Sequence, residues 1–70
     1  MMDWHDDPGG QAATLIEGDA RGRVWRTAAD TWAALLSIRG DATAAYSFAT
    51  REEAQAWCEA QVAERRKPRS

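Results

Sequence analysis

Mostly apolar residues recur at three- and four-residue spacing near the C-terminal end of the chain. The stripe comprises Ala54, Trp57, Cys58, Gln61, Val62 and Arg65. This spacing predicts an amphipathic helix with Trp57 as the largest buried group. At its start Thr50 can accept a hydrogen bond from the Glu53 amide, while Glu53 reaches back to the Thr50 amide as a capping box. We therefore expect a helix over about 51–66.

Alternating residues before this helix predict a strand over residues 44–48. The alternation places Tyr46 and Phe48 on one face, with Ala45 and Ser47 on the other. A single strand is not stable by itself, so a hairpin partner is required. Gly40 and Asp41 lie just upstream and suit a hairpin loop.

The segment 31–38 allows two interpretations. As a strand, it places Trp32, Ala34, Leu36 and Ile38 on one side. As a short helix capped by Asp30 it would cluster its large apolar residues, and its alanines favour that form. The strand is preferred because residues 44–48 need a hairpin partner.

Two earlier segments complete the expected architecture. Residues 23–27 predict a further strand, residues 13–17 could form another, and 18–22 would link them. The fold class is then α+β, with a small antiparallel β-sheet of three or four strands and one C-terminal α-helix packed on one face. Trp57 would lie at the centre of the core, so Trp57→Ala is expected to unfold the domain.

Both ends of the chain lack periodicity. Residues 1–11 contain Asp-Pro-Gly-Gly turn chemistry and predict a flexible N-terminal arm. Residues 67–70 predict a basic tail, because Pro68 stops a helix. A single α+β domain is thus expected over 12–66.

Composition limits the class of protein. The chain has 70 residues, a net charge of -2 and one cysteine, which argues against a strongly cationic nucleic-acid binder and against an intrachain disulfide. No apolar run approaches the ~20 residues of a membrane span. The acidic, polar start does not resemble a signal peptide, so a bacterial cytoplasm is the expected location.

Groups suited to catalysis are scarce. His5 lies in the predicted arm among aspartates, where a solvated acidic segment is the simpler interpretation than a metal clamp. Cys58 lies on the predicted buried stripe, without a histidine in an ordered element to activate it. The capping box explains Glu53, and solvent explains Glu52. We therefore expect a protein that is not an enzyme, with no catalytic residue, metal or cofactor.

Arginine residues accompany an aromatic residue on the predicted sheet. They are Arg21, Arg23, Arg26 and Arg39, with Trp25 among them. Such a strand could meet phosphates and stack a base, or it could simply be the solvent face of a half-covered sheet. The acidic total argues against tight nonspecific binding of nucleic acid.

A single helix leaves the far face of the sheet uncovered. Trp4, Leu15, Trp25 or Leu35 could lie there, and exposed aromatic and arginine side chains often anchor protein contacts. Alternatively, Trp25 and Leu35 complete the core on the covered side. A homodimer through that face or through an edge strand would enlarge a small core.

Residues 31–60 resemble small sheet-plus-helix proteins of phages and mobile elements, of the kind that include anti-CRISPR inhibitors. The resemblance lies in Thr31-Trp32 through Leu36, in Ile38-Arg39-Gly40, in Tyr46 through Ala54, and in Trp57. It implies a binding protein that blocks a host defence complex, and it transfers no catalytic residue.

The expected function is therefore a small non-enzymatic binding protein of phage or mobile-element origin. It would inhibit a host protein or nucleoprotein complex by steric occupation of a surface, with carboxylates that mimic phosphates or with Trp and Arg anchors. The candidate partner-binding residues are Arg23, Trp25, Arg26, Arg39, Glu52, Glu59 and Glu64. The alternative is a nucleic-acid-binding accessory protein that uses the arginine-bearing strand.

Overall fold

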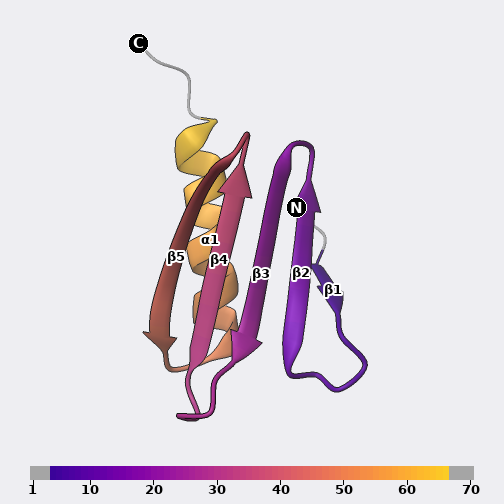
Figure 1. Ribbon diagram of the computed structural model, residues 1–70, viewed down its shortest axis with the longest axis vertical. Coiled ribbons are helices and arrows are strands. Elements are labelled where there is room, and N and C mark those ends of the chain that lie inside the picture. The colour runs from indigo at the N-terminus through magenta and orange to yellow at the C-terminus, as the bar shows by residue number, and fades with distance from the viewer. Residues whose placement is uncertain (1–3, 67–70) are drawn as a thin grey trace.

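A computed structural model describes residues 4–66 as one antiparallel sheet with a helix on one face (Figure 1). The elements are β1 (Trp4–Asp6), β2 (Ala12–Glu17), β3 (Ala20–Arg26), β4 (Trp32–Ile38), β5 (Asp41–Phe48) and α1 (Arg51–Arg65). Each strand pairs with its neighbours in the chain, in the order β1-β2-β3-β4-β5. The α+β class with a C-terminal helix is confirmed, while the sheet has five strands within these residues rather than three or four. The predicted basic tail, 67–70, lies outside the described residues.

Strand β1 is the unexpected element. The segment predicted to be a loose arm instead places Trp4 opposite Leu15 and Asp6 opposite Ala13. The turn residues that suggested a linker form the connection to β2, where the amide of Gly10 donates to the carbonyl of Asp7 over 2.9 Å. The turn residues that suggest a linker in the sequence therefore form the loop of a β-hairpin between β1 and β2.

Strand β4 lies inside the sheet, between β3 and β5, so the helical interpretation of 31–38 is wrong. It pairs with β3 through Val24 opposite Ala34 and with β5 through Ala34 opposite Ala45. Tertiary pairing on both sides outweighs the helical preference of its alanines.

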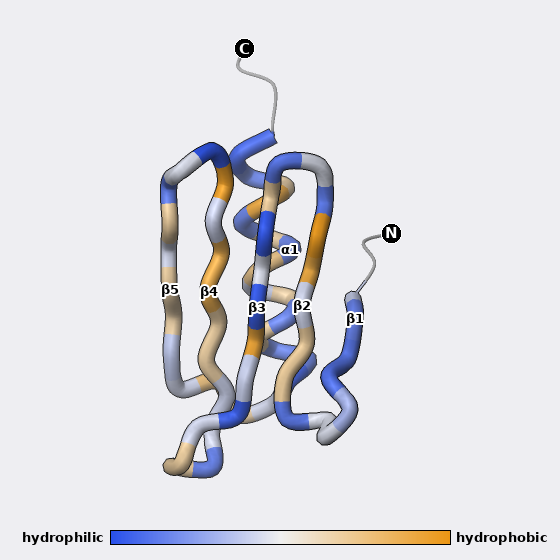
Figure 2. Tube along the Cα trace, turned by 45° about the vertical axis from the view of Figure 1, so that its right-hand side comes forward, coloured by the Kyte–Doolittle hydropathy of each residue, from blue (hydrophilic) through white to orange (hydrophobic). Residues whose placement is uncertain are grey.

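The core lies between α1 and the sheet. Its fully buried side chains include Leu15, Val24 and Leu36 from the strands, and Ala54, Cys58 and Val62 from the helix. Figure 2 shows hydrophobic stretches of β2, β3 and β4 beside α1. Four-residue spacing aims the three small helix residues at the sheet, which lets the helix approach closely.

Trp57 is at the edge of this core, not at its centre. It is partly buried and packs against Phe48, with ring centroids 6.2 Å apart and a 50° angle between the ring planes. The indole points toward Phe48 of β5, away from the middle of the sheet, where Ala54 and Cys58 pack. The expected central role of Trp57 is therefore wrong.

The hairpin between β4 and β5 has the two-residue loop Arg39–Gly40, one residue before the loop expected from the sequence. Ile38 lies opposite Asp41, and the φ angles of Arg39 and Gly40 are 53° and 88°. Positive φ at both loop positions is the geometry of a type I′ turn, whose twist matches that of the flanking strands.

A β-bulge in β5 separates two aromatic residues that the sequence placed together. Ala45 lies opposite Ala34 and Phe48 opposite Trp32, so β5 holds one more residue than β4 in this interval. Ser47 takes up the extra residue with a φ of 68°. Because one inserted residue reverses the alternation, Phe48 faces α1 whereas Tyr46 points to the other side of the sheet.

The helix start is close to the expected capping box. The Glu53 amide donates to the Thr50 hydroxyl over 3.1 Å, as predicted. In return, the Glu53 carboxylate accepts from the amide of Ala49 rather than from that of Thr50. Arg66 caps the other end. Across residues 4–66, α1 falls short of the length and apolar character that a membrane crossing requires.

Candidate functional site: the open sheet face

The face of the sheet opposite α1 carries a mixed set of aromatic, aliphatic and arginine side chains. Strand alternation and pairing place thirteen residues on it, and we call this set the open face. They are His5, Ala12, Thr14, Ile16, Arg21, Arg23, Trp25, Ala33, Leu35, Ser37, Ala42, Ala44 and Tyr46. Ile16, Leu35 and Tyr46 are 51%, 39% and 66% exposed, which is high for large hydrophobic side chains.

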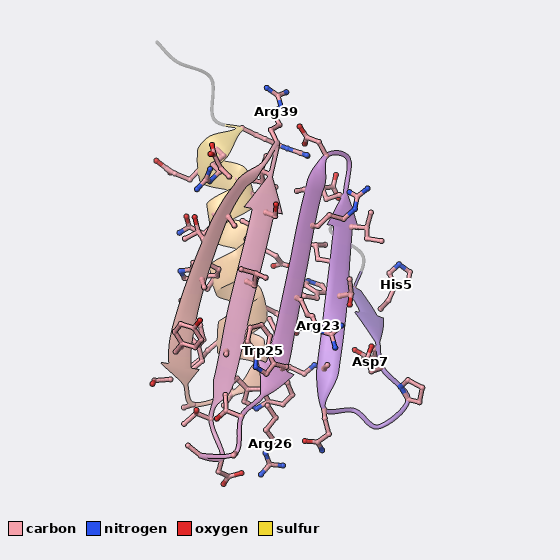
Figure 3. All side chains as sticks on the ribbon, viewed as in Figure 1. His5, Asp7, Arg23, Trp25, Arg26 and Arg39 are labelled. Atoms are coloured by element: carbon pink, nitrogen blue, oxygen red, sulfur yellow. The ribbon has the colours of Figure 1, made fainter. Side chains whose placement is uncertain are left out.

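Trp25 is the largest apolar side chain of the open face and lies near the end of β3. Its strand partners are Ala12 on β2 and Ala33 on β4. Both alanines are buried although α1 lies on the opposite face, and Trp25 itself is half-buried between them. Figure 3 shows the Trp25 side chain on the side of the sheet away from α1. The indole therefore covers its small neighbours and leaves a flat apolar surface.

Two arginines, Arg21 and Arg23, precede Trp25 on the same face of β3. Arg23 donates to the Asp7 carboxylate over 3.3 Å and to the Thr14 hydroxyl over 3.5 Å. Arg21 folds toward the β2–β3 hairpin and donates to the carbonyls of Gly18 and Ala20. Asp7 therefore offsets the charge of Arg23, whereas Arg21 meets only backbone carbonyls and keeps its positive charge on this face.

Arg26 and Arg39 do not belong to the open face. Arg26 lies at the end of β3, alternates toward the helix side and forms an ion pair with Asp30 in the next loop. Arg39 is in the β4–β5 turn at the other end of the sheet, where its Nε donates to Asp19 over 2.6 Å. Figure 3 shows the two arginines at opposite ends. The expected arginine patch is therefore reduced to Arg21 and Arg23.

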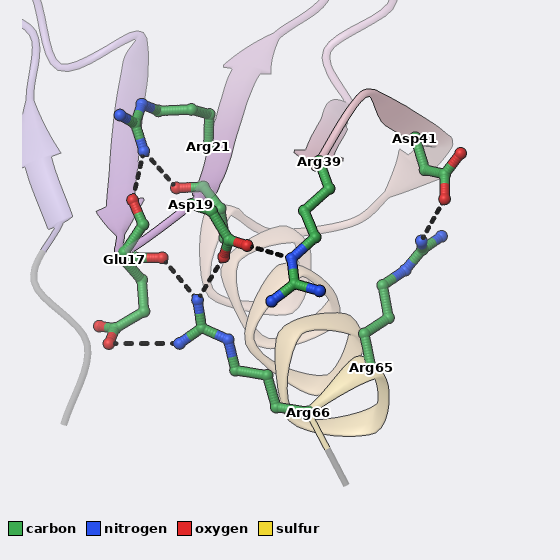
Figure 4. A network of polar contacts seen from close by, with 9 residues as sticks. Glu17, Asp19, Arg21, Arg39, Asp41, Arg65 and Arg66 are labelled. Atoms are coloured by element: carbon green, nitrogen blue, oxygen red, sulfur yellow. Dashed lines mark hydrogen bonds and ion pairs between the residues drawn. The ribbon is translucent and has the colours of Figure 1, made fainter.

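A polar network ties the C-terminal end of α1 to two hairpins (Figure 4). Arg66 donates to the Glu17 carbonyl over 2.8 Å and to the Asp19 carboxylate over 2.9 Å. Hydrogen bonds from Arg39 and Arg66 lower the pKa of Asp19 below its ordinary value. These groups are largely exposed, so each pair contributes little stability alone.

The three acidic candidates lie on the helix, away from the open face. Glu52 and Glu64 are exposed. Glu59 is half-buried and accepts a 2.9 Å hydrogen bond from the indole of Trp4 on β1. Glu59 therefore holds the edge strand in place, and the seven candidate residues do not form one surface.

The sequence does not predict the position of two large apolar members of the open face. Strict alternation places Tyr46 on the face of Phe48, because nothing in the sequence marks the bulge at Ser47. Ile16 follows Leu15 in β2, and alternation alone would have placed one of them on the uncovered side. Of the four residues expected on this face, Trp25 and Leu35 lie there. The expectation is wrong for Leu15, which is fully buried on the helix side, and for Trp4, which lies opposite Leu15 and packs against the same core.

The groups considered for catalysis lie apart. His5 is on the open-face side of edge strand β1, whereas Cys58 is fully buried under the sheet. Burial, with a smaller contribution from Glu59, raises the pKa of Cys58 to about 12, so this thiol is protonated at neutral pH. Residues 4–66 hold no group of three or more His, Cys, Asp or Glu side chains that could bind a metal.

Comparison of the chain with protein-family models, with curated proteins and with solved structures gave no match.

Proposed function

We propose that this protein is a non-enzymatic binding module whose open face docks onto a larger protein. The observation that carries the proposal is the group of Trp25, Leu35 and Tyr46 around Ala33, on the face that α1 does not cover. Large apolar side chains exposed together on a small domain favour a partner that covers them.

The composition of the open face favours a protein surface as that partner. Trp, Tyr and Arg are the residues enriched among binding hot spots, and here they occupy one rigid sheet. Leu35 and Ile16 add aliphatic area, which a protein pocket can bury. The arginines lie beside these apolar side chains, where they can pair with carboxylates at the rim of an interface.

The mechanism we propose is steric occupation of a functional surface on a host protein or nucleoprotein complex. A phage or mobile-element origin, a bacterial cytoplasmic location and a CRISPR–Cas target are supported by the resemblance of residues 31–60 to small inhibitors of that kind. Glu52 and Glu64, on the outer side of α1, would remain free to face a basic groove of the same target.

A binding assay with purified CRISPR–Cas complexes tests both the target and the surface. Leu35→Lys and Tyr46→Ser change exposed side chains, so both variants should fold. We expect each to weaken capture at least tenfold, with Ala56→Lys on the exposed side of α1 as the matched control. Binding by both variants with wild-type affinity would overturn the open face as the docking surface, and failure to bind any such complex would overturn the proposed target.

Nucleic-acid binding is a second candidate, favoured by one specific observation. Arg21 and Arg23 lie two residues apart on β3, followed at the same spacing by Trp25, and only Arg23 of the two arginines pairs with a carboxylate, that of Asp7. Arginine and aromatic side chains in such a row can meet phosphates and stack a base. Titration with a single-stranded oligonucleotide at increasing salt tests this: steep loss of affinity, further weakened by Arg23→Ala, supports it, and no binding at low salt excludes it.

A further inference from the structure

The outer edge of β5 is a long strand edge that nothing in residues 4–66 covers. β5 is the last strand of the sheet and spans eight residues, whereas β1 at the other edge has three. Figures 1 and 2 both show α1 behind the sheet, not across this edge. The edge therefore presents backbone donors and acceptors whose natural partner is another extended strand.

Strand β5 also lacks most of the features that prevent edge pairing. It contains no Lys, Arg, Glu or Pro, and the segment 42–46 is Ala-Thr-Ala-Ala-Tyr. Charged residues and proline are the usual protection of an exposed edge, and a short strand, as in β1, is another. The bulge at Ser47 and the charge of Asp41 limit pairing on either side of this segment, and within it Thr43 accepts a hydrogen bond from the Arg65 side chain on the helix side of the strand.

We propose that the β5 edge pairs with the β5 edge of a second copy of this chain, antiparallel and centred on Ala44. In this register Ala44 of one chain lies opposite Ala44 of the other. Ala42 lies opposite Tyr46 of the other chain, and Thr43 lies opposite its Ala45. Each large side chain thus meets a small one, and Asp41 stays outside the paired segment. The two sheets join into one, with both helices on the same side.

The aromatic residues beside the edge supply the area that the backbone pairing lacks. A stable interface needs about 800 Å² from each partner, which five residues of edge strand do not provide. Tyr46 is 66% exposed on one side of the edge, and the partly buried pair of Phe48 and Trp57 lies on the other. A second copy covers apolar surface on both sides, and the two open faces become continuous.

Cysteine cross-linking tests the register. Opposite residues of an antiparallel pair lie within disulfide reach, so Ala44→Cys should yield a covalent dimer on mild oxidation. Ala42→Cys is the matched control, since it has the same strand, face and exposure but its two copies lie four residues apart across the pair. Cys58 is fully buried and does not compete. Equal cross-linking of both variants, or none by Ala44→Cys, would overturn the proposed register.

Charge substitution tests the association itself. Sedimentation or light scattering over rising protein concentration should show a mass approaching twice 7.8 kDa. Ala44→Lys and Ala44→Glu should each weaken self-association at least tenfold, because like charges meet at the centre, and an equal mixture should restore it. The proposal is overturned if the wild type is monomeric at every concentration, or if both Ala44 variants dimerise as strongly as the wild type.

Discussion

The indole of Trp4 donates a 2.9 Å hydrogen bond to the carboxylate of Glu59, which joins residues 55 apart in the chain. On the same flank, Arg51 forms an ion pair of 2.6 Å with Asp6. These two contacts link the first strand to the helix, in addition to its pairing with β2. The three-residue strand β1 is thus held both by backbone pairing with β2 and by side-chain contacts with α1. A substitution on α1 can remove one of these side-chain contacts without changing the backbone pairing.

Glu59→Ala should loosen β1 while leaving the rest of the sheet intact. Loss of this partly buried hydrogen bond costs about 1 kcal/mol of unfolding free energy. Hydrogen exchange should accelerate at residues 4–6 far more than in β3 and β4. Glu64→Ala, an exposed change on the same helix, is the control and should have almost no effect; equal exchange in the two variants would argue against the role of Glu59.

Leu36→Ala should destabilise the protein more than Trp57→Ala does. Leu36 is fully buried in the middle of the sheet, and its truncation costs about 2–5 kcal/mol, comparable with the whole stability of a small domain. Trp57 is only partly buried beside Phe48, so its loss should cost about 1–2 kcal/mol and leave a folded chain. Chemical denaturation of both variants measures the difference, and the reverse order would contradict the core described here.

Acid should remove the contribution of Asp19. Hydrogen bonds from Arg39 and Arg66 lower its pKa in the folded state. Its stabilisation is therefore fully present above the unfolded pKa of ~4 and is lost as the pH falls through the lower folded value. The Tm of the wild type should exceed that of Asp19→Asn at neutral pH. This difference in Tm should disappear in acid and become smaller in high salt. A difference that does not change with pH would contradict this account.

Cys58 should resist thiol reagents in the native protein. The thiol is buried, and its pKa is raised to about 12, so neither access nor thiolate is available. Modification should become fast only in denaturant. An Ala56→Cys variant provides an exposed thiol on α1 for comparison and should react at once under native conditions, whereas fast labelling of wild-type Cys58 would show that the helix opens readily.

Local signals in the sequence predict the helix and the central strands well. Thr50 and Glu53 lie within one turn of each other, so their capping geometry depends on little else. The alternation of Leu36 and Ile38 likewise identifies one buried face of β4. The helix cap and the alternation of β4 depend only on residues close in sequence, and the structure confirms both.

Features that depend on distant contacts were not predictable in this way. β1 is supported by Glu59 and Arg51, which follow it by more than forty residues, so its sequence alone resembles a linker. The side of the sheet that Tyr46 faces depends on the bulge at Ser47, which lets Phe48 meet Trp32 and Trp57. The open face was expected, but half of its aromatic content was assigned to the wrong side.

The order of elements along the chain has a consequence for synthesis on the ribosome. Each hairpin closes as soon as its second strand emerges, because all strand pairs are adjacent in sequence. The apolar side of the sheet, however, has no cover until Ala54, Cys58 and Val62 leave the exit tunnel. Both faces of the nascent sheet are therefore exposed to solvent until α1 covers the face that carries Leu15, Val24 and Leu36.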